Sequence, residues 1–149
     1  MLLKKIFLLV FLIQILSGCI PLNENSTNVI SYRVIGETTN PVFEKLNKSA
    51  TNSKDSKFKI FVENHTVSKE DIAYNSLGVV TAYNVSVKMN IKIESETEIL
   101  FQRSISTSKN LKNLNKSSAD EEIFNRAISE LYERIFLRIK RVLINLNET

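Results

Sequence analysis

Cys19 is the only cysteine in the 149-residue chain and the residue with the clearest chemical potential. A cysteine thiolate is a nucleophile that can form a disulfide, bind a metal or accept a covalent group. One cysteine cannot form an internal disulfide. Two small residues, Ser17 and Gly18, stand directly before it. A single leftover thiol needs another role, and covalent modification supplies one.

The segment before Cys19 has the features of a secretion signal. Lys4 and Lys5 form a short basic region, and a mainly apolar run follows over residues 6–16. This run is shorter than the roughly 20 apolar residues that cross a bilayer. Residues 16–19 resemble the lipobox of bacterial lipoproteins. The resemblance implies that a peptidase cleaves the chain before Cys19 and that the cysteine carries a covalent diacylglycerol and an N-acyl chain such as palmitate. The alternative is an ordinary signal peptide followed by an unrelated cysteine.

Length and charge limit what the mature chain can be. Removal of residues 1–18 leaves about 130 residues, which suits a single domain over 29–149 after a lipidated cysteine and tether at 19–28. The formal charge of +4 includes Lys4 and Lys5, so the mature chain is only mildly basic. This charge is not typical of a nucleic-acid-binding protein, and no nucleic-acid partner is expected.

The first half of the domain predicts a strand, a short helix and a second strand. Apolar residues over 29–35 indicate the first strand, which Gly36 ends. Asn40 and Pro41 have the residue types of a helix N-cap and first helical position. Alternating apolar residues over 57–63 then indicate the second strand.

The most regular pattern of the chain lies over residues 79–93. From Tyr83 to Ile93 every odd position is apolar and every even position is polar, which predicts a strand with one buried face. At about 3.3 Å per residue this strand would be unusually long, so we expect a bend or bulge. Apolar residues resume at 99–105 after a polar turn at 94–97, which predicts an antiparallel hairpin.

A polar loop is expected at 106–117, followed by a long C-terminal helix. Ser118 and Glu121 have the spacing of a capping box. A broad apolar stripe runs from Ile123 to Leu146, wider than the seam of a coiled coil, so a core role is favoured over a partner helix. Acidic residues at 120–122 and basic residues at 138–141 are interpreted as complements of the helix dipole.

Together these elements predict an α+β fold. It is a two-layer sandwich with a mostly antiparallel sheet of about four strands. The short first helix and the long C-terminal helix lie on one face.

Few residues are candidates for catalysis. His65, the single histidine, lies in a polar segment after the second strand, where a solvated loop side chain is the favoured interpretation. Glu70 and Asp71 are interpreted as a solvated turn. The chain has no second histidine and no cysteine cluster for a usual zinc site, so we expect no enzyme, no catalytic residue, no metal and no cofactor beyond the lipid on Cys19.

Two groups of residues are candidates for binding. Lys88 and Lys92, with Arg103 on the neighbouring strand, form a candidate basic strip for lipid phosphates on the exposed hairpin face. The alternative is that these residues only keep a polar face soluble. Tyr74 and Tyr83 flank the start of the long strand and could anchor a partner or pack at a sheet edge.

The chain resembles the lipopolysaccharide-assembly lipoprotein (LptE) family. The resemblance rests on residues 16–19, on 72–74 approaching Gly78, on the strand at 81–87, and on 119–122 at the start of the last helix. Two features depart from the family pattern: the first helix is short, and the loop at 106–117 has no tyrosine.

This resemblance implies an outer-membrane lipoprotein of a Gram-negative cell, lodged as a plug in an LptD-type β-barrel. It would lie at the periplasmic face or in the barrel lumen and assist lipopolysaccharide transport. Lipopolysaccharide would be contacted through basic residues, for which Lys88, Lys92 and Arg103 are the candidates. Ile20, where an aspartate would retain the protein at the inner membrane, agrees with outer-membrane sorting.

Two other functions remain open at this point. One is a periplasmic lipoprotein that regulates a peptidoglycan synthase, although such regulators usually have a longer tether than 19–28. The other is a small surface lipoprotein that binds a ligand or host component.

The first prediction concerns Cys19. Cys19→Ser should accumulate as an unlipidated, uncleaved precursor, because the serine hydroxyl is a much weaker nucleophile than the cysteine thiolate. Radiolabelled palmitate and the mass of the product would measure this. A mutant that still matures and takes up lipid would contradict the lipobox interpretation.

Overall fold

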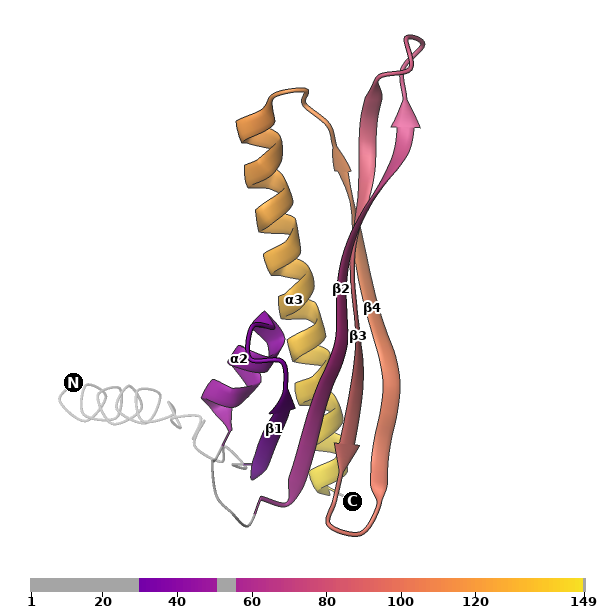
Figure 1. Ribbon diagram of the computed structural model, residues 1–149. Coiled ribbons are helices and arrows are strands. Elements are labelled where there is room, and N and C mark those ends of the chain that lie inside the picture. Colours follow the sequence, from indigo (N-terminus) through magenta and orange to yellow (C-terminus); the bar gives the residue numbers. More distant parts are fainter. Residues whose placement is uncertain (1–29, 51–55, 149) are drawn as a thin grey trace, which may run out of the picture.

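A four-stranded sheet with two helices on one face forms the body of the protein (Figure 1). The computed structural model describes residues 30–50 and 56–148, so Cys19, the signal peptide and the tether lie outside the described residues. In chain order the elements are β1 (Tyr32–Gly36), α2 (Pro41–Ser49), β2 (Phe58–Tyr74), β3 (Val80–Glu94), β4 (Ile99–Lys112) and α3 (Ser117–Glu148). This architecture confirms the predicted α+β class.

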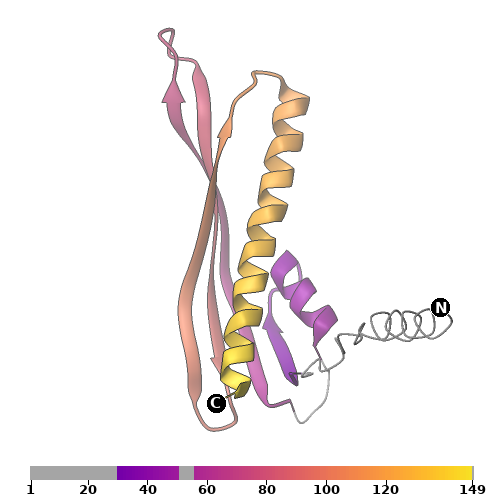
Figure 2. The same ribbon diagram turned by 180° about the vertical axis from the view of Figure 1, so that it is seen from behind.

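The strands lie in the order β1-β2-β3-β4. β1 runs parallel to β2, and the two longer pairs are antiparallel. β1 covers only residues 58–62 of β2. Above Val62, β2 therefore becomes an edge strand, and β4 is an edge strand along its whole length. Figure 2, seen from behind, shows α3 running lengthwise across this sheet.

The predicted alternation of β3 is confirmed. Its six inward residues are at most 1% exposed, namely Tyr83, Val85, Val87, Met89, Ile91 and Ile93. α3 covers this face with Leu131, Ile135 and Ile139, which are all fully buried. Burial of each such side chain contributes roughly 1.5 to 3 kcal/mol, so the contact between β3 and α3 supplies much of the core energy.

The start of α2 agrees with the sequence pattern. The Asn40 side chain accepts hydrogen bonds from the backbone N–H of Val42 at 2.8 Å and from that of Phe43, and Pro41 occupies the first turn. Val42 and Leu46 are fully buried against the core. The Tyr32 hydroxyl donates a 3.1 Å bond to the Leu46 carbonyl, which ties α2 to β1.

The expected end of the second strand near residue 63 is wrong, since β2 continues to Tyr74. Its register shifts between Glu63 and Thr66, where Asn64 adopts φ +51°. Beyond this bulge β2 again pairs with β3, so Glu70 and Asp71 are strand residues and not a turn. Residues 66–72 are exposed, so their side chains show no apolar alternation. Backbone pairing with β3, and not a buried apolar face of its own, holds this part of the strand.

The loop expected at 106–117 is also mostly wrong, because β4 extends to Lys112. Two inward positions of this extension are polar and reach α3. Lys109 forms a 2.5 Å ion pair with Glu130, and the Thr107 hydroxyl lies 3.5 Å from the Leu131 carbonyl. Because residues 106–110 are polar on both faces of this edge strand, their sequence shows no alternation of apolar and polar residues.

The long helix is confirmed, but its ends differ from the prediction. α3 begins at Ser117, so Ser118 lies inside the first turn. Asp120 accepts backbone hydrogen bonds from Leu114 and Lys116 and so closes the turn before the helix. At the other end, α3 extends to Glu148 with no basic residue in its last turn. The basic residues at 138–141 are therefore not explained by the helix dipole. Within 30–50 and 56–148, no helix is both long and apolar enough to cross a membrane.

The second prediction tests the core. Val87→Asp and Leu131→Asp should each abolish cooperative folding, because an unpaired buried charge costs several kcal/mol against a total stability of about 5 to 15 kcal/mol. Thermal melts followed by circular dichroism would show this. Asn90→Asp and Ser129→Asp, at exposed positions of the same two elements, are matched controls that should melt near the native temperature. Near-native melts of the two core variants would contradict the assignment of the inward face.

Candidate functional site

One face of the sheet is turned away from α2 and α3 (Figure 1). We call it the open face. The outward side chains of its three central rows, taken across β2, β3 and β4, are Glu63, Asn90 and Ser104; Thr66, Lys88 and Ser106; and Ser68, Ser86 and Ser108. Most of these side chains are short, polar and uncharged. The open face therefore suits contact with another polar surface.

Cross-strand hydrogen bonds order this face. The hydroxyls of Ser68 and Ser86 lie 2.7 Å apart, and the Asn84 side-chain amide donates a 2.6 Å bond to the Asn110 side-chain oxygen. Each bond links β3 to a neighbouring strand. Such pairs stabilise a sheet modestly, by roughly 0.2 to 1 kcal/mol, and they also hold the side chains in fixed positions. The open face is thus a pre-organised polar surface.

The structure separates the three candidate basic residues. Lys88 and Lys92 lie on the open face, four positions apart along β3. Arg103 pairs with the inward Ile91 and precedes the buried Ile105 by two positions, so the register places it on the helix-covered side, at the exposed β4 edge. The predicted strip of three on one exposed face is therefore not formed.

Lys88 and Lys92 differ in their surroundings. The Lys92 ammonium lies 2.9 Å from the Glu94 carboxylate and 4.1 Å from the centre of the Phe61 ring. Its side chain is 29% exposed, and its charge is already balanced. Lys88 is exposed and has no ion pair within the part of the chain that the structure describes. Lys88 is accordingly the better-placed cation for an external phosphate.

A shallow depression of about 470 Å³ lies between β3 and β4. Lys92, Arg103 and Glu63 line it together with uncharged polar residues. Because both acidic and basic side chains line the depression, it does not favour ions of one charge sign. No group of three or more histidine, cysteine, aspartate or glutamate residues that could hold a metal occurs in 30–50 and 56–148.

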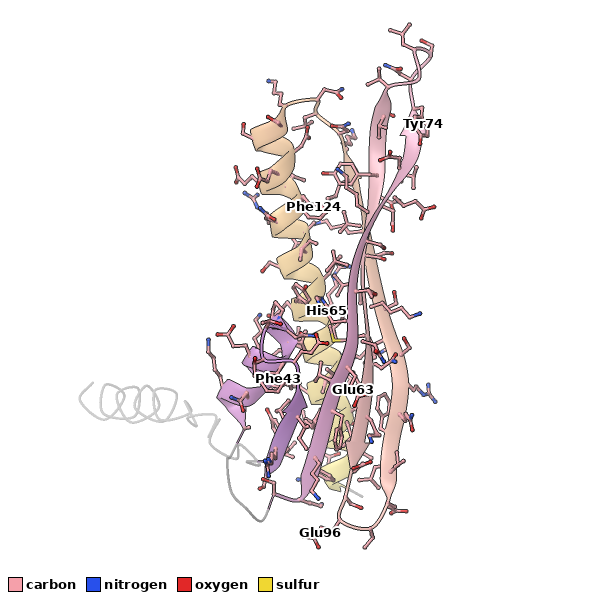
Figure 3. All side chains as sticks on the ribbon, viewed as in Figure 1. Phe43, Glu63, His65, Tyr74, Glu96 and Phe124 are labelled. Atoms are coloured by element: carbon pink, nitrogen blue, oxygen red, sulfur yellow. The ribbon has the colours of Figure 1, made fainter. Side chains whose placement is uncertain are left out.

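The two candidate tyrosines have different environments. Tyr74 is 59% exposed near the tip of the β2–β3 hairpin (Figure 3), where Leu77 is 85% exposed. Tyr83 is 1% exposed, and the Lys69 ammonium lies 4.0 Å from the centre of its ring. Burial, with the nearby Asp120 carboxylate, raises the pKa of the Tyr83 hydroxyl. Tyr83 is therefore a core residue, and only Tyr74 is available to a partner.

The hairpin tip is a rigid apolar projection. The Asn75 side chain accepts hydrogen bonds from the backbone N–H groups of Leu77 and Val79, both at 2.9 Å, and Gly78 supplies the positive φ of the turn. No charged residue occurs from 72 to 87. Large apolar side chains that are exposed close together are typical of a surface that contacts another molecule.

His65 is not a solvated loop residue, which corrects the interpretation from sequence. The β2 bulge turns it inward, and its Nε2 atom lies 2.7 Å from the Tyr132 hydroxyl on α3. Tyr132 is 8% exposed, and burial raises the pKa of its hydroxyl. The pair connects β2 to α3 just above the end of β1. No pattern in the sequence links residues 67 positions apart, so only the fold reveals this contact.

These features define a helix-on-sheet domain with a bare polar face, and solved structures share this fold. Comparison with protein-family models and with curated protein sequences gives no match. Solved structures with a similar fold include three that are described as lipoproteins.

Rare lipoprotein B from Shewanella oneidensis aligns with a TM-score of 0.59 at 12% identity, over 78% of this chain and 98% of that one. An uncharacterized lipoprotein B from Nitrosomonas europaea gives 0.55 at 13% identity, over 76% and 79%. A minor lipoprotein from Acinetobacter baumannii gives 0.52 at 12% identity, over 78% and 92%. The chain therefore has the fold of the rare lipoprotein B proteins, which is the LptE-like fold that the sequence resemblance predicted.

The third prediction compares the two lysines of the open face. Lys92→Ala should lower the free energy of unfolding by about 1 kcal/mol, because it removes the Phe61 and Glu94 contacts. Lys88→Ala, which removes no ion pair, should change it by less than about 0.5 kcal/mol. Urea denaturation of both variants measures the difference, and Lys92→Met is a control that keeps most of the side-chain packing on Phe61. Equal small changes would show that the contacts of Lys92 contribute no net stability.

Proposed function

We propose that this protein is an outer-membrane lipoprotein that plugs and supports an LptD-type β-barrel and so assists lipopolysaccharide assembly. Its role would be non-catalytic. Cys19, through its covalent lipid, would hold the chain at the membrane, and the α+β domain would sit in the barrel lumen. The lipoproteins that share this fold support the lipid-anchored part of the proposal.

The open face is the observation that carries the proposal. It extends over three strands of 14 to 17 residues, and neither α2 nor α3 covers it. In its three central rows, seven of the nine side chains are serine, threonine or asparagine. The lumen of a large membrane barrel is polar and wet, so a wall of that kind would match this surface. A membrane lipid or an apolar protein surface would leave the hydroxyl and amide groups without partners.

The lysines of the open face are the proposed contacts for lipopolysaccharide. Lipopolysaccharide carries phosphate groups, and an ammonium group binds phosphate as a point charge. Lys88 is exposed and has no acidic partner in the described segments, whereas Lys92 would have to leave Glu94. Lys88 would therefore be the main contact, with Lys92 secondary and Arg103 approaching from the β4 edge.

The two other functions predict different partners. A regulator of a peptidoglycan synthase would bind a soluble periplasmic domain and would need to reach it from the membrane. Only residues 19–29 separate Cys19 from the described domain, which gives at most about 40 Å of fully extended chain. A small surface lipoprotein would not co-purify with a barrel protein in near-equal amount.

The fourth prediction concerns the barrel. Affinity purification of the lipidated protein from detergent-solubilised outer membrane should recover a large β-barrel protein in near-equal amount. A plug enclosed by a barrel buries more than the roughly 1,200 to 2,000 Å² of a standard interface, so the complex should withstand detergent and salt. Recovery of a peptidoglycan synthase, or of no partner, would overturn the proposal.

A pair of double variants tests the face that makes the contact. Asn90→Trp with Ser106→Trp adds bulk at two exposed positions of the open face and should prevent recovery of the barrel. Asn125→Trp with Ser129→Trp adds the same bulk at exposed positions of α3 and should retain it. Both pairs should melt near the native temperature. If both lose the barrel, or both keep it, the open face is not the contact surface.

The fifth prediction concerns lipopolysaccharide. Lys88→Ala should weaken binding of purified lipopolysaccharide by about five- to tenfold, corresponding to loss of one charge-assisted contact of roughly 1 kcal/mol or slightly more. Lys112→Ala removes an exposed charge at the end of β4 and serves as the control. If the Lys88→Ala and Lys92→Ala double variant binds as tightly as the native protein, the two lysines only keep the face soluble.

A further inference from the structure

The second half of α3 carries an exposed surface that the proposed function does not use. Leu137 and Ile144 are 52% and 45% exposed and lie seven residues apart, on the side of the helix opposite Ile135. Three basic residues lie between them in sequence: Arg138, Lys140 and Arg141. All three are exposed. We call these five residues the α3 basic face.

This surface has a strong charge bias. From 134 to 147 α3 contains four basic residues and no acidic residue. The nearest acid on the N-terminal side, Glu133, is paired with Lys45, and Glu130 is paired with Lys109. In 30–50 and 56–148, none of the three cations of the α3 basic face forms an ion pair. The cations also lie too far from the end of α3 to stabilise the helix dipole.

The α3 basic face lies toward the end of the domain from which the chain leads to Cys19. The Lys57 ammonium donates a hydrogen bond to Asn147 at the end of α3, and Phe58 pairs with Tyr32 at the start of β1. The first strand, the start of β2 and the end of α3 therefore share one end of the molecule (Figures 1 and 2). At most about 40 Å of extended chain links Cys19 to this end, whereas β3 alone spans about 50 Å. The hairpin tip lies at the far end.

We propose that the α3 basic face docks on the anionic phospholipid surface of the membrane that holds the lipid anchor. Leu137 and Ile144 enter the boundary between headgroups and acyl chains, and the three cations contact headgroup phosphates, as on amphipathic helices that lie in a membrane interface. Docking fixes the tilt of the domain, because a lipid on Cys19 alone permits rotation about the anchor. The proposal is independent of the barrel and of lipopolysaccharide.

A second copy of this chain is a poorer occupant. An isologous pair of α3 helices would bring Arg138 and Arg141 of one copy against the same cations of the other. Like charges at close range oppose such contact. Two half-exposed aliphatic side chains are also a small apolar area for a stable dimer. An anionic bilayer, in contrast, matches both the charge and the apolar residues.

Tryptophan fluorescence tests the docking directly, because the native chain has no tryptophan. The full lipidated protein would carry Leu137→Trp and be reconstituted in vesicles containing about one third phosphatidylglycerol. We expect a blue-shifted emission and quenching by brominated acyl chains, since the indole lies at the headgroup boundary. Leu77→Trp, at the far end of the molecule, is the control and should emit as in water without quenching. Ile144→Trp should repeat the result of Leu137→Trp.

Charge variants test the electrostatic part. The triple variant Arg138→Gln, Lys140→Gln and Arg141→Gln should lower the docked-to-undocked ratio by on the order of a hundredfold. The triple variant Lys112→Gln, Lys116→Gln and Arg126→Gln changes net charge equally at exposed positions away from the α3 basic face and should leave the ratio unchanged. High salt or purely zwitterionic vesicles should also reduce quenching.

Four results would overturn the proposal. The first is no quenching at position 137 in anionic vesicles while the lipid anchor is inserted. The second is equal quenching in zwitterionic vesicles, and the third is a requirement for lipopolysaccharide in place of phosphatidylglycerol. The fourth is a blue shift that needs no vesicle or that brominated lipid does not quench, which would indicate a protein occupant.

Discussion

The structure depends on burial of one face of β3 beneath α3. Every inward side chain from Tyr83 to Ile93 is almost completely buried, and the facing residues of α3 have no exposed surface. Because side chains alternate along a strand, this single contact also determines which residues point away. The same constraint that forms the core thus presents serine, asparagine and lysine side chains in fixed rows on the open face.

The edges of the sheet follow from the same geometry. β1 is only five residues long and covers the lower part of β2, so the upper sheet has three strands with two free edges. In this three-stranded part, contacts between side chains replace some of the stabilisation that a fourth strand would give. His65 bonds Tyr132 just above β1, Lys109 pairs with Glu130, and Lys69 lies over the Tyr83 ring. Each connects an edge strand to the central strand or to α3 with a polar group that water can also reach, which keeps the edges soluble.

The two ends of the domain have opposite chemistry. The tip of the β2–β3 hairpin is uncharged and apolar, whereas the end that leads to Cys19 combines cations of α3 with Leu137 and Ile144. The membrane-docking proposal uses the second half of α3, and the barrel proposal uses the open face.

The sequence by itself determined the elements whose pattern arises from burial on one side. The alternation of β3, the apolar stripe of α3 and the Asn40–Pro41 start of α2 all predicted the structure correctly, because local periodicity reflects a local face. The tertiary structure alone decided the remainder. The upper half of β2 and the end of β4 are strands only because β3 offers them hydrogen-bonding partners, and their polar side chains carry no periodic signal. The side of the sheet on which Arg103 lies depends on the register with Ile91, and the contact of His65 with Tyr132 depends on a bulge at Asn64. Register and bulges are set by pairing between distant segments, so residue types within one segment cannot specify them.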